Sequence, residues 1–264
     1  MVHFFNKYGH YQGSLYPKIE LNSGMIVVKQ ALAYHNVDER NRIAEEIVRG
    51  MKHNMRKTLM YYSKKGKDVN KHIENIEKEQ ILHQNINQIL SSEGKLWQHY
   101  YPAFNEITKK FPIEKREFRP PTNEMNALIS FGNSLLYTTT LSEIYHTYLH
   151  PSISFLHEPR ERRFSLACDI ADIFKPIIIS RTIFKLVNTN MINEKSFKKD
   201  VGVYLTEKGR QKFIEEYNNK LKTTIKHPNL NKKVSYRYLL RLEGYKIIKH
   251  ILNDKPYESF KAWW

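Results

Sequence analysis

The chain has 264 residues, of which 41% are hydrophobic, so it is long enough and apolar enough to bury a substantial core. Lysine and arginine number 43 against 27 aspartate and glutamate residues, which gives a formal net charge of +16 at pH 7. This excess favours a polyanionic partner, because binding releases counterions. Nucleic acid is therefore the leading class of partner, and an anionic membrane surface is its rival.

The sequence lacks the features of a membrane or secreted protein. No stretch approaches the ~20 apolar residues of a transmembrane helix. Residues 1–5 lack the basic segment and apolar run of a signal peptide. Cys168 is the only cysteine, so no intramolecular disulfide can form and a reducing compartment is expected. These observations predict a cytoplasmic protein that makes no use of a membrane.

The first 18 residues differ from the rest of the chain. Two short aromatic-rich runs, 2–6 and 11–16, flank Lys7-Tyr8-Gly9-His10, a pattern typical of a β-hairpin or of two edge strands. An isolated hairpin cannot bury both of its faces. We therefore expect it to pack on the helical body, on a partner or on further strands.

Helical periodicity begins at Ser23 and dominates the remaining sequence. Apolar spacing predicts helices over about 25–62, 69–90, 92–105, 122–150, 160–174, 207–225 and 234–252, the fifth of them ending before Pro176. Residues 195–206 predict one small internal hairpin. The predicted fold is mainly α: a hairpin and linker over 1–22, and a large helical domain over 23–264.

Within the predicted helix over 160–174, residues 164–174 are apolar on almost the whole circumference at ~100° per residue, so this part is expected to be buried. Only Ser165, Asp169 and Asp172 share the remaining arc. Buried carboxylates are costly unless a cation or hydrogen-bond donors meet them. Two interpretations stay open. The acids bind a divalent metal together with His157, a ligand set that suits Mg²⁺ or Mn²⁺, or they pair with nearby arginines such as Arg162 or Arg163.

Glu93 is a second candidate for a functional acid. Ser91 or Ser92 is a suitable N-cap, which places Glu93 in the first turn of the predicted helix over 92–105. A glutamate in a first turn interacts favourably with the helix dipole and needs no function. The local sequence alone therefore favours a structural role.

Four groups of motifs follow one another along nearly the whole chain. They are His3-Phe4-Phe5-Asn6 with Tyr8-Gly9 and Gly13…Tyr16-Pro17; Glu93-Gly94 with Tyr100-Tyr101; Arg119-Pro120-Pro121 with the segment 126–137; and His150-Pro151, Phe155-Leu156-His157 and Phe164-Ser165-Leu166…Asp169…Asp172…Phe174-Lys175-Pro176. Together they resemble the CRISPR adaptation integrase, the catalytic subunit of the spacer-acquisition complex.

The resemblance implies a metal-dependent DNA integrase and endonuclease. By it, Glu93, His157 and Asp172 correspond to the ligands of Mg²⁺ or Mn²⁺, and Asp169 to the neighbouring acid counted with them as catalytic. The implied reaction is a transesterification in which a DNA 3′-hydroxyl attacks a phosphodiester of the repeat array. With water as the nucleophile, the same site would cut DNA.

The resemblance also implies partners: DNA, a small companion adaptation subunit, and a second copy of the full-length chain. The family begins with a β-sheet domain, of which only the final strands match here, so the hairpin is expected to be its remnant. Basic residues near the predicted ligands or the central helix are expected to contact DNA phosphates, namely Arg116, Arg119, Arg160, Arg162 and Arg163. The alternative is a non-catalytic basic helical DNA-binding or scaffolding protein, which would leave the Asp169/Asp172 stripe without a purpose.

Overall fold

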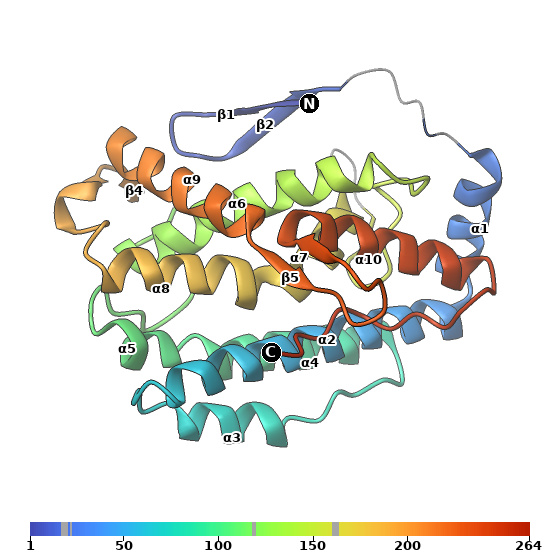
Figure 1. Ribbon diagram of the computed structural model, residues 1–264, viewed down its shortest axis with the longest axis horizontal. Helices are drawn as coiled ribbons and strands as arrows, with labels where there is room; N and C mark the ends of the chain where they lie inside the picture. The colour runs from blue at the N-terminus through green and yellow to red at the C-terminus, as the bar shows by residue number, and fades with distance from the viewer. Residues whose placement is uncertain (17–20, 22, 118–119, 160–163) are drawn as a thin grey trace.

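The computed structural model describes residues 1–16, 21, 23–117, 120–159 and 164–264. These residues form a helical body with small antiparallel hairpins at its surface (Figure 1), which confirms the mainly α fold. The helices are α1 (Gly24–His35), α2 (Val37–Ser63), α3 (Asn70–Lys78), α4 (Ile86–Tyr100), α5 (Ala103–Thr108), α6 (Glu124–Ile144), α7 (Ser165–Lys175), the π-helical turn η1 (Pro176–Ser180), α8 (Arg181–Asn188), the 3-10 turn η2 (Glu194–Ser196), α9 (Glu207–Lys222) and α10 (Tyr236–Ile251).

The described strands pair as three hairpins: β1 (Val2–Phe5) with β2 (Tyr11–Leu15), β3 (Phe197–Lys199) with β4 (Val203–Leu205), and β5 (Thr224–Lys226) with β6 (Lys233–Ser235). The β3–β4 pair is the predicted internal hairpin. The β5–β6 pair was not predicted, so the expectation of one internal hairpin was wrong. Residues 224–235 carry lysines and a central proline and no strong alternation of apolar residues, which is why the pattern did not indicate strands.

Helix α2 runs through the core of the body and packs against α7, α3 and α4. Its apolar residues recur every four positions, so they form one stripe that is inaccessible to solvent. The stripe consists of Ile43, Ile47, Met51, Met55 and Leu59, each 0% exposed. Helix α6, by contrast, is buried on most of its circumference, since it packs on α7, on α10 and on β4.

Several predicted helix boundaries were wrong because capping residues were missed. The predicted helix over 25–62 is two helices, since Asn36 caps α2 by accepting a hydrogen bond from Glu39 N at 3.1 Å. The predicted division at residues 90–92 does not exist. Helix α4 begins at Ile86, where Asn85 accepts from Gln88 N at 3.0 Å. The long helix predicted over 122–150 ends at Ile144, where a turn follows in which Thr147 Oγ1 donates to the carbonyl of Ile144 at 2.7 Å.

Pro176 does not end the helix that precedes it. The chain continues from α7 through the π-helical turn η1 directly into α8. A proline removes one backbone donor, and a π turn accommodates this by shifting the pairing to i→i+5. Asp172 and Arg181 therefore lie on one continuous helical segment.

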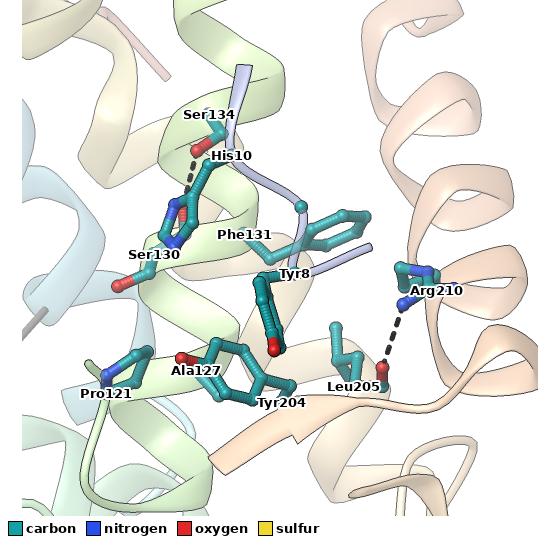
Figure 2. A pocket seen from close by; sticks show the side chains of 11 residues that line it. Tyr8, His10, Pro121, Ala127, Ser130, Phe131, Ser134, Tyr204, Leu205 and Arg210 are labelled. Atoms are coloured by element: carbon teal, nitrogen blue, oxygen red, sulfur yellow. Dashed lines mark hydrogen bonds between the residues drawn. The ribbon is translucent and has the colours of Figure 1, made fainter. Parts of the chain in front are cut away.

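The N-terminal hairpin packs on α6 and β4. His3 Nε2 lies 2.7 Å from Ser142 Oγ, and the rings of Tyr16 and Tyr145 stack with centroids 4.3 Å apart. Figure 2 shows Tyr8 against Tyr204 of β4 at the turn of the hairpin, where the ring centroids are 4.6 Å apart. The domain boundary predicted at residue 22 falls on residues outside those the structure describes.

No helix in the described part of the chain is long and apolar enough to cross a membrane.

Candidate active site

Asp169 on α7 is the anchor of the loop that carries His157. Its side chain is 0% exposed and is surrounded by backbone donors. Phe155 N and Leu156 N donate to Oδ2 at 2.7 and 3.0 Å, and His157 N donates to Oδ1 at 3.0 Å. Because both carboxylate oxygens are engaged in this way, the geometry favours a positioning role for Asp169 over direct contact with a substrate or metal.

His157 is oriented by the same carboxylate. Its Nδ1 lies 2.8 Å from Asp169 Oδ1, while Nε2 points to Asp172 Oδ2 at 3.9 Å. A carboxylate that holds one ring nitrogen and leaves the other facing a site is the usual arrangement behind a metal-binding histidine. Burial lowers the pKa of His157, but the hydrogen bond to Asp169 and the charge of Asp172 outweigh it, so the pKa is raised.

Asp172 lies one helical turn after Asp169 and is 1% exposed. Lys175, one further turn along α7, forms an ion pair with its Oδ1. Among the described residues, Asp172 Oδ1 is a buried atom that accepts no hydrogen bond of good geometry. Burial lowers the pKa of Lys175, but the charge of Asp172 more than compensates and raises it. The lysine is thus the cation that balances this acid.

Lys175 was missed as a site residue by the sequence analysis. The available signal was the i,i+3 spacing of Asp172 and Lys175 on a helix expected to be buried, where a lysine needs a partner. The arginines considered there as partners of Asp169 and Asp172, Arg162 and Arg163, lie outside the described residues.

Glu93 reaches the site from the middle of α4, so the prediction of a first-turn position was wrong. Its Oε1 accepts a hydrogen bond from Trp97 Nε1 at 2.6 Å. Burial, followed by the negative charge of Asp172, raises the pKa of Glu93 to about 7. An acid from α4 and an acid from α7 therefore act on each other, and the helix dipole no longer explains Glu93.

The donor set formed by Glu93, His157 and Asp172 suits a hard divalent cation in its chemistry, since it offers carboxylate oxygens and one imidazole. Among the residues that the structure describes, however, no three His, Cys, Asp or Glu side chains are gathered closely enough to hold a metal ion by themselves. Lys175 takes the place beside Asp172. A metal would therefore need Lys175 to turn away and the ligands to close.

Of the five arginines predicted to contact DNA, the structure describes only Arg116. Its guanidinium donates to Asn126 Oδ1 at 3.0 Å and to Ser130 Oγ at 2.8 Å, both on α6. Burial lowers the pKa of Arg116. The side chain therefore ties the loop after α5 to the central helix. Arg119, Arg160, Arg162 and Arg163 lie outside the described residues.

Comparison with known proteins gives the family. The family model of the CRISPR associated protein Cas1 matches residues 1–219. The CRISPR-associated endonuclease Cas1 of Clostridium perfringens is 46% identical over 100% of this chain and 82% of its own length. That of Pyrococcus horikoshii is 41% identical over 100% of this chain and 81% of its own length. The chain belongs to the CRISPR-associated Cas1 family.

Solved structures agree with this assignment. A Cas1 protein from Thermotoga maritima, 40% identical, has a TM-score of 0.82 and covers 98% of this chain and 80% of that one. A casposase bound to its integration product has a TM-score of 0.85 over 99% of this chain and 74% of that one. At 19% identity, the casposase shows a shared fold.

Proposed function

We propose that the chain cuts and joins DNA strands in CRISPR spacer acquisition, with a divalent metal ion bound by Glu93, His157 and Asp172. The observation that carries the proposal is the electrostatic interaction between the buried Asp172 of α7 and the partly buried Glu93 of α4, beside an imidazole that Asp169 holds in place. The relatives named CRISPR-associated endonucleases support the activity, since they match the whole of this chain.

Bound Mg²⁺ or Mn²⁺ would supply a Lewis acid for the scissile phosphodiester. The protein contributes the geometry. Asp169 keeps Nδ1 of His157 engaged, so that Nε2 is presented to the site. Trp97 fixes the carboxylate of Glu93. The ammonium group of Lys175 lies beside Trp97, with its Nζ 5.6 Å from the centre of the ring. When Lys175 turns away from Asp172, its ammonium group can neutralise an oxygen of the DNA phosphate.

The proposed partners are DNA and a small companion adaptation subunit. Their support is the net charge of +16 and the similar fold of the chain in a Cas6-RT-Cas1–Cas2 complex, with a TM-score of 0.84 at 19% identity. Dimerisation of the full-length form, a cytoplasmic location and the assignment of the hairpin as a remnant of a larger β domain stay predictions.

One observation favours a second candidate, a DNA-binding scaffold without catalysis. The ion pair between Lys175 and Asp172 balances the charge of this acid without any metal. In that case Asp169 and Asp172, which are both buried, would serve stability alone.

A branched DNA that mimics an integration intermediate separates the two candidates. We expect strand transfer in Mn²⁺, none in chelator, and a loss of at least about a hundredfold in Asp172→Asn and His157→Ala. Asp200→Asn, an exposed acid in the β3–β4 turn, is the matched control and should act like the wild type. Direct Mn²⁺ binding, followed as a rise in melting temperature, should be lost with Asp172→Asn. DNA binding without strand transfer or a metal effect in the wild type would favour the scaffold.

A further inference from the structure

Three aromatic side chains are exposed where α2, α8 and the segment 256–264 meet. Trp263 and Trp264 are 40% and 41% exposed, and Tyr61 is 37% exposed. The two tryptophan rings contact each other edge to face, with centroids 5.1 Å apart, while the ring of Phe260 packs against both. Large aromatic rings left at a surface lose the free energy of burial, so a cluster of them indicates a binding surface.

Cations accompany these rings. Tyr61 and Trp264 line a cavity of about 140 Å³ together with Lys57, Lys64 and Arg181, and no acidic residue of the described chain lines it. The guanidinium carbon of Arg181 lies 4.4 Å from the centre of the Tyr61 ring. None of these three cations forms an ion pair with an acid in the described ranges. The aromatic–basic surface consists of Tyr61, Trp263, Trp264, Lys57, Lys64 and Arg181.

A further lysine shows that positive charge is in excess beside this surface. The ring of Tyr236 contacts that of Trp264 at 5.8 Å, and Lys220 Nζ lies 4.1 Å from the centre of the Tyr236 ring. Burial and the charge of Arg181 together lower the pKa of Lys220 to about 7. The nearby acid, Glu216, is already paired with Lys185 at 2.7 Å. An anion bound here would relieve the repulsion between Arg181 and Lys220.

The aromatic–basic surface and the candidate active site lie on different sides of one helical segment. Lys175 and Ile179 line a small pocket with Trp97 of α4. Ile177 and Arg181, which alternate with them along the segment, line the cavity beside α2. At 1.5 Å per residue, Arg181 is about 13 Å further along the axis than Asp172. The aromatic–basic surface is therefore distinct from the candidate metal ligands.

We propose that the aromatic–basic surface binds single-stranded nucleic acid, whose bases stack on the exposed rings while its phosphates contact the lysines and Arg181. Planar rings interleaved with cations match a chain of planar bases joined by phosphates. A duplex would not use the rings, because its base faces are already stacked. The binding needs neither metal nor catalysis, so it goes beyond the proposed function and is tested independently of it.

The test measures the affinity of the chain for a labelled 12-nucleotide oligo-dT, by fluorescence anisotropy in chelator. Replacing both Trp263 and Trp264 by alanine should weaken binding at least about fivefold, because each stacked base contributes on the order of 1–3 kcal/mol. Tyr148→Ala, an exposed aromatic outside the surface, is the matched control and should leave the affinity unchanged. A wild-type chain should bind an abasic oligonucleotide of the same length as weakly as the double variant binds oligo-dT.

The cations provide a second test, on side chains whose removal leaves the core intact. Lys57→Gln with Lys64→Gln should lower the slope of log affinity against log salt by about 1.4, because each phosphate that a lysine neutralises on a single strand contributes ~0.7 to that slope. Lys71→Gln, an exposed lysine of α3, should not change the slope by more than the measurement error.

Three results would overturn the proposal. The first is equal affinity of the wild type for the abasic and the oligo-dT strands. The second is unchanged oligo-dT affinity in the double tryptophan variant when that variant remains folded by its melting curve. The third is self-association of the wild type that the same variant abolishes while oligo-dT binding persists, which would assign the surface to a protein contact.

Discussion

Replacing Asp169 by asparagine tests whether this residue positions the His157 loop. The carboxylate accepts from two backbone donors at Oδ2, and from one backbone donor and the His157 ring at Oδ1. Asparagine keeps one oxygen, so whichever way the amide is placed its NH₂ group faces two donors. An unsatisfied buried donor costs about 1–3 kcal/mol, which gives a loss of about 2–6 kcal/mol. For a chain of this size that corresponds to a melting temperature lower by roughly 5–15 °C.

Asp172→Asn is the matched control, because it removes the same charge one turn away on the same helix. Asp172 Oδ1 accepts no hydrogen bond of good geometry from the described residues, and its partner Lys175 is 24% exposed and can turn to solvent. We expect a loss below about 2 kcal/mol. Urea unfolding of both variants provides the measurement. Equal losses in the two variants would refute the positioning role of Asp169.

Three further predictions concern the site and its support. The pKa of Glu93 is raised from 4.5 to about 7, so between these pH values the folded state holds a proton that the unfolded state has released. The free energy of unfolding should therefore fall by on the order of 3 kcal/mol as the pH rises through this window. This fall should disappear in Glu93→Gln when unfolding is followed from pH 4.5 to 7.5. Lys175→Met should tighten Mn²⁺ binding severalfold in calorimetry, since it removes the cation that competes for Asp172, and weaker binding would contradict that competition. Gly50→Ala should lower the free energy of unfolding in urea by about 1–3 kcal/mol, because the new Cβ would clash with Ser259 Oγ and lie close to Phe260 O. An unchanged unfolding midpoint would show that the segment 256–264 moves to make room for the methyl group.

The sequence predicted the buried helix with its acidic stripe because the evidence for it is local. Asp169 and Asp172 stand out only because almost every other position of 164–174 is apolar, and the structure buries both of them. The same pattern could not divide their roles, since that division depends on a loop that folds back over Asp169. Asp169 accepts hydrogen bonds from the loop, whereas Asp172 interacts with Glu93. Helical periodicity alone cannot predict this difference.

Glu93 shows the opposite case, in which a local signal was misleading. Ser91 and Ser92 are suitable caps by residue type, yet Asn85 performs this role and the serines lie inside α4. Ser92 instead accepts a hydrogen bond from Leu82 N at 3.0 Å, in the chain segment that precedes the helix. Cap preferences rank residues, but tertiary packing chooses among them. The placement of Glu93 as a ligand therefore came from the family resemblance, and it stays a prediction.

The site is built so that a loop, rather than a helix, sets the position of its imidazole. Ser154 Oγ donates to the carbonyl of His157 and lies 2.8 Å from Ser165 Oγ, so the loop is tied to the start of α7 as well as to Asp169. Rigid support of this kind lowers the cost of ordering His157 each time a ligand arrives. Glu93, by contrast, is held by Trp97 alone among its described hydrogen-bond partners. The movement needed to close the ligand set is therefore expected in α4 and Lys175, while the His157 loop stays in place.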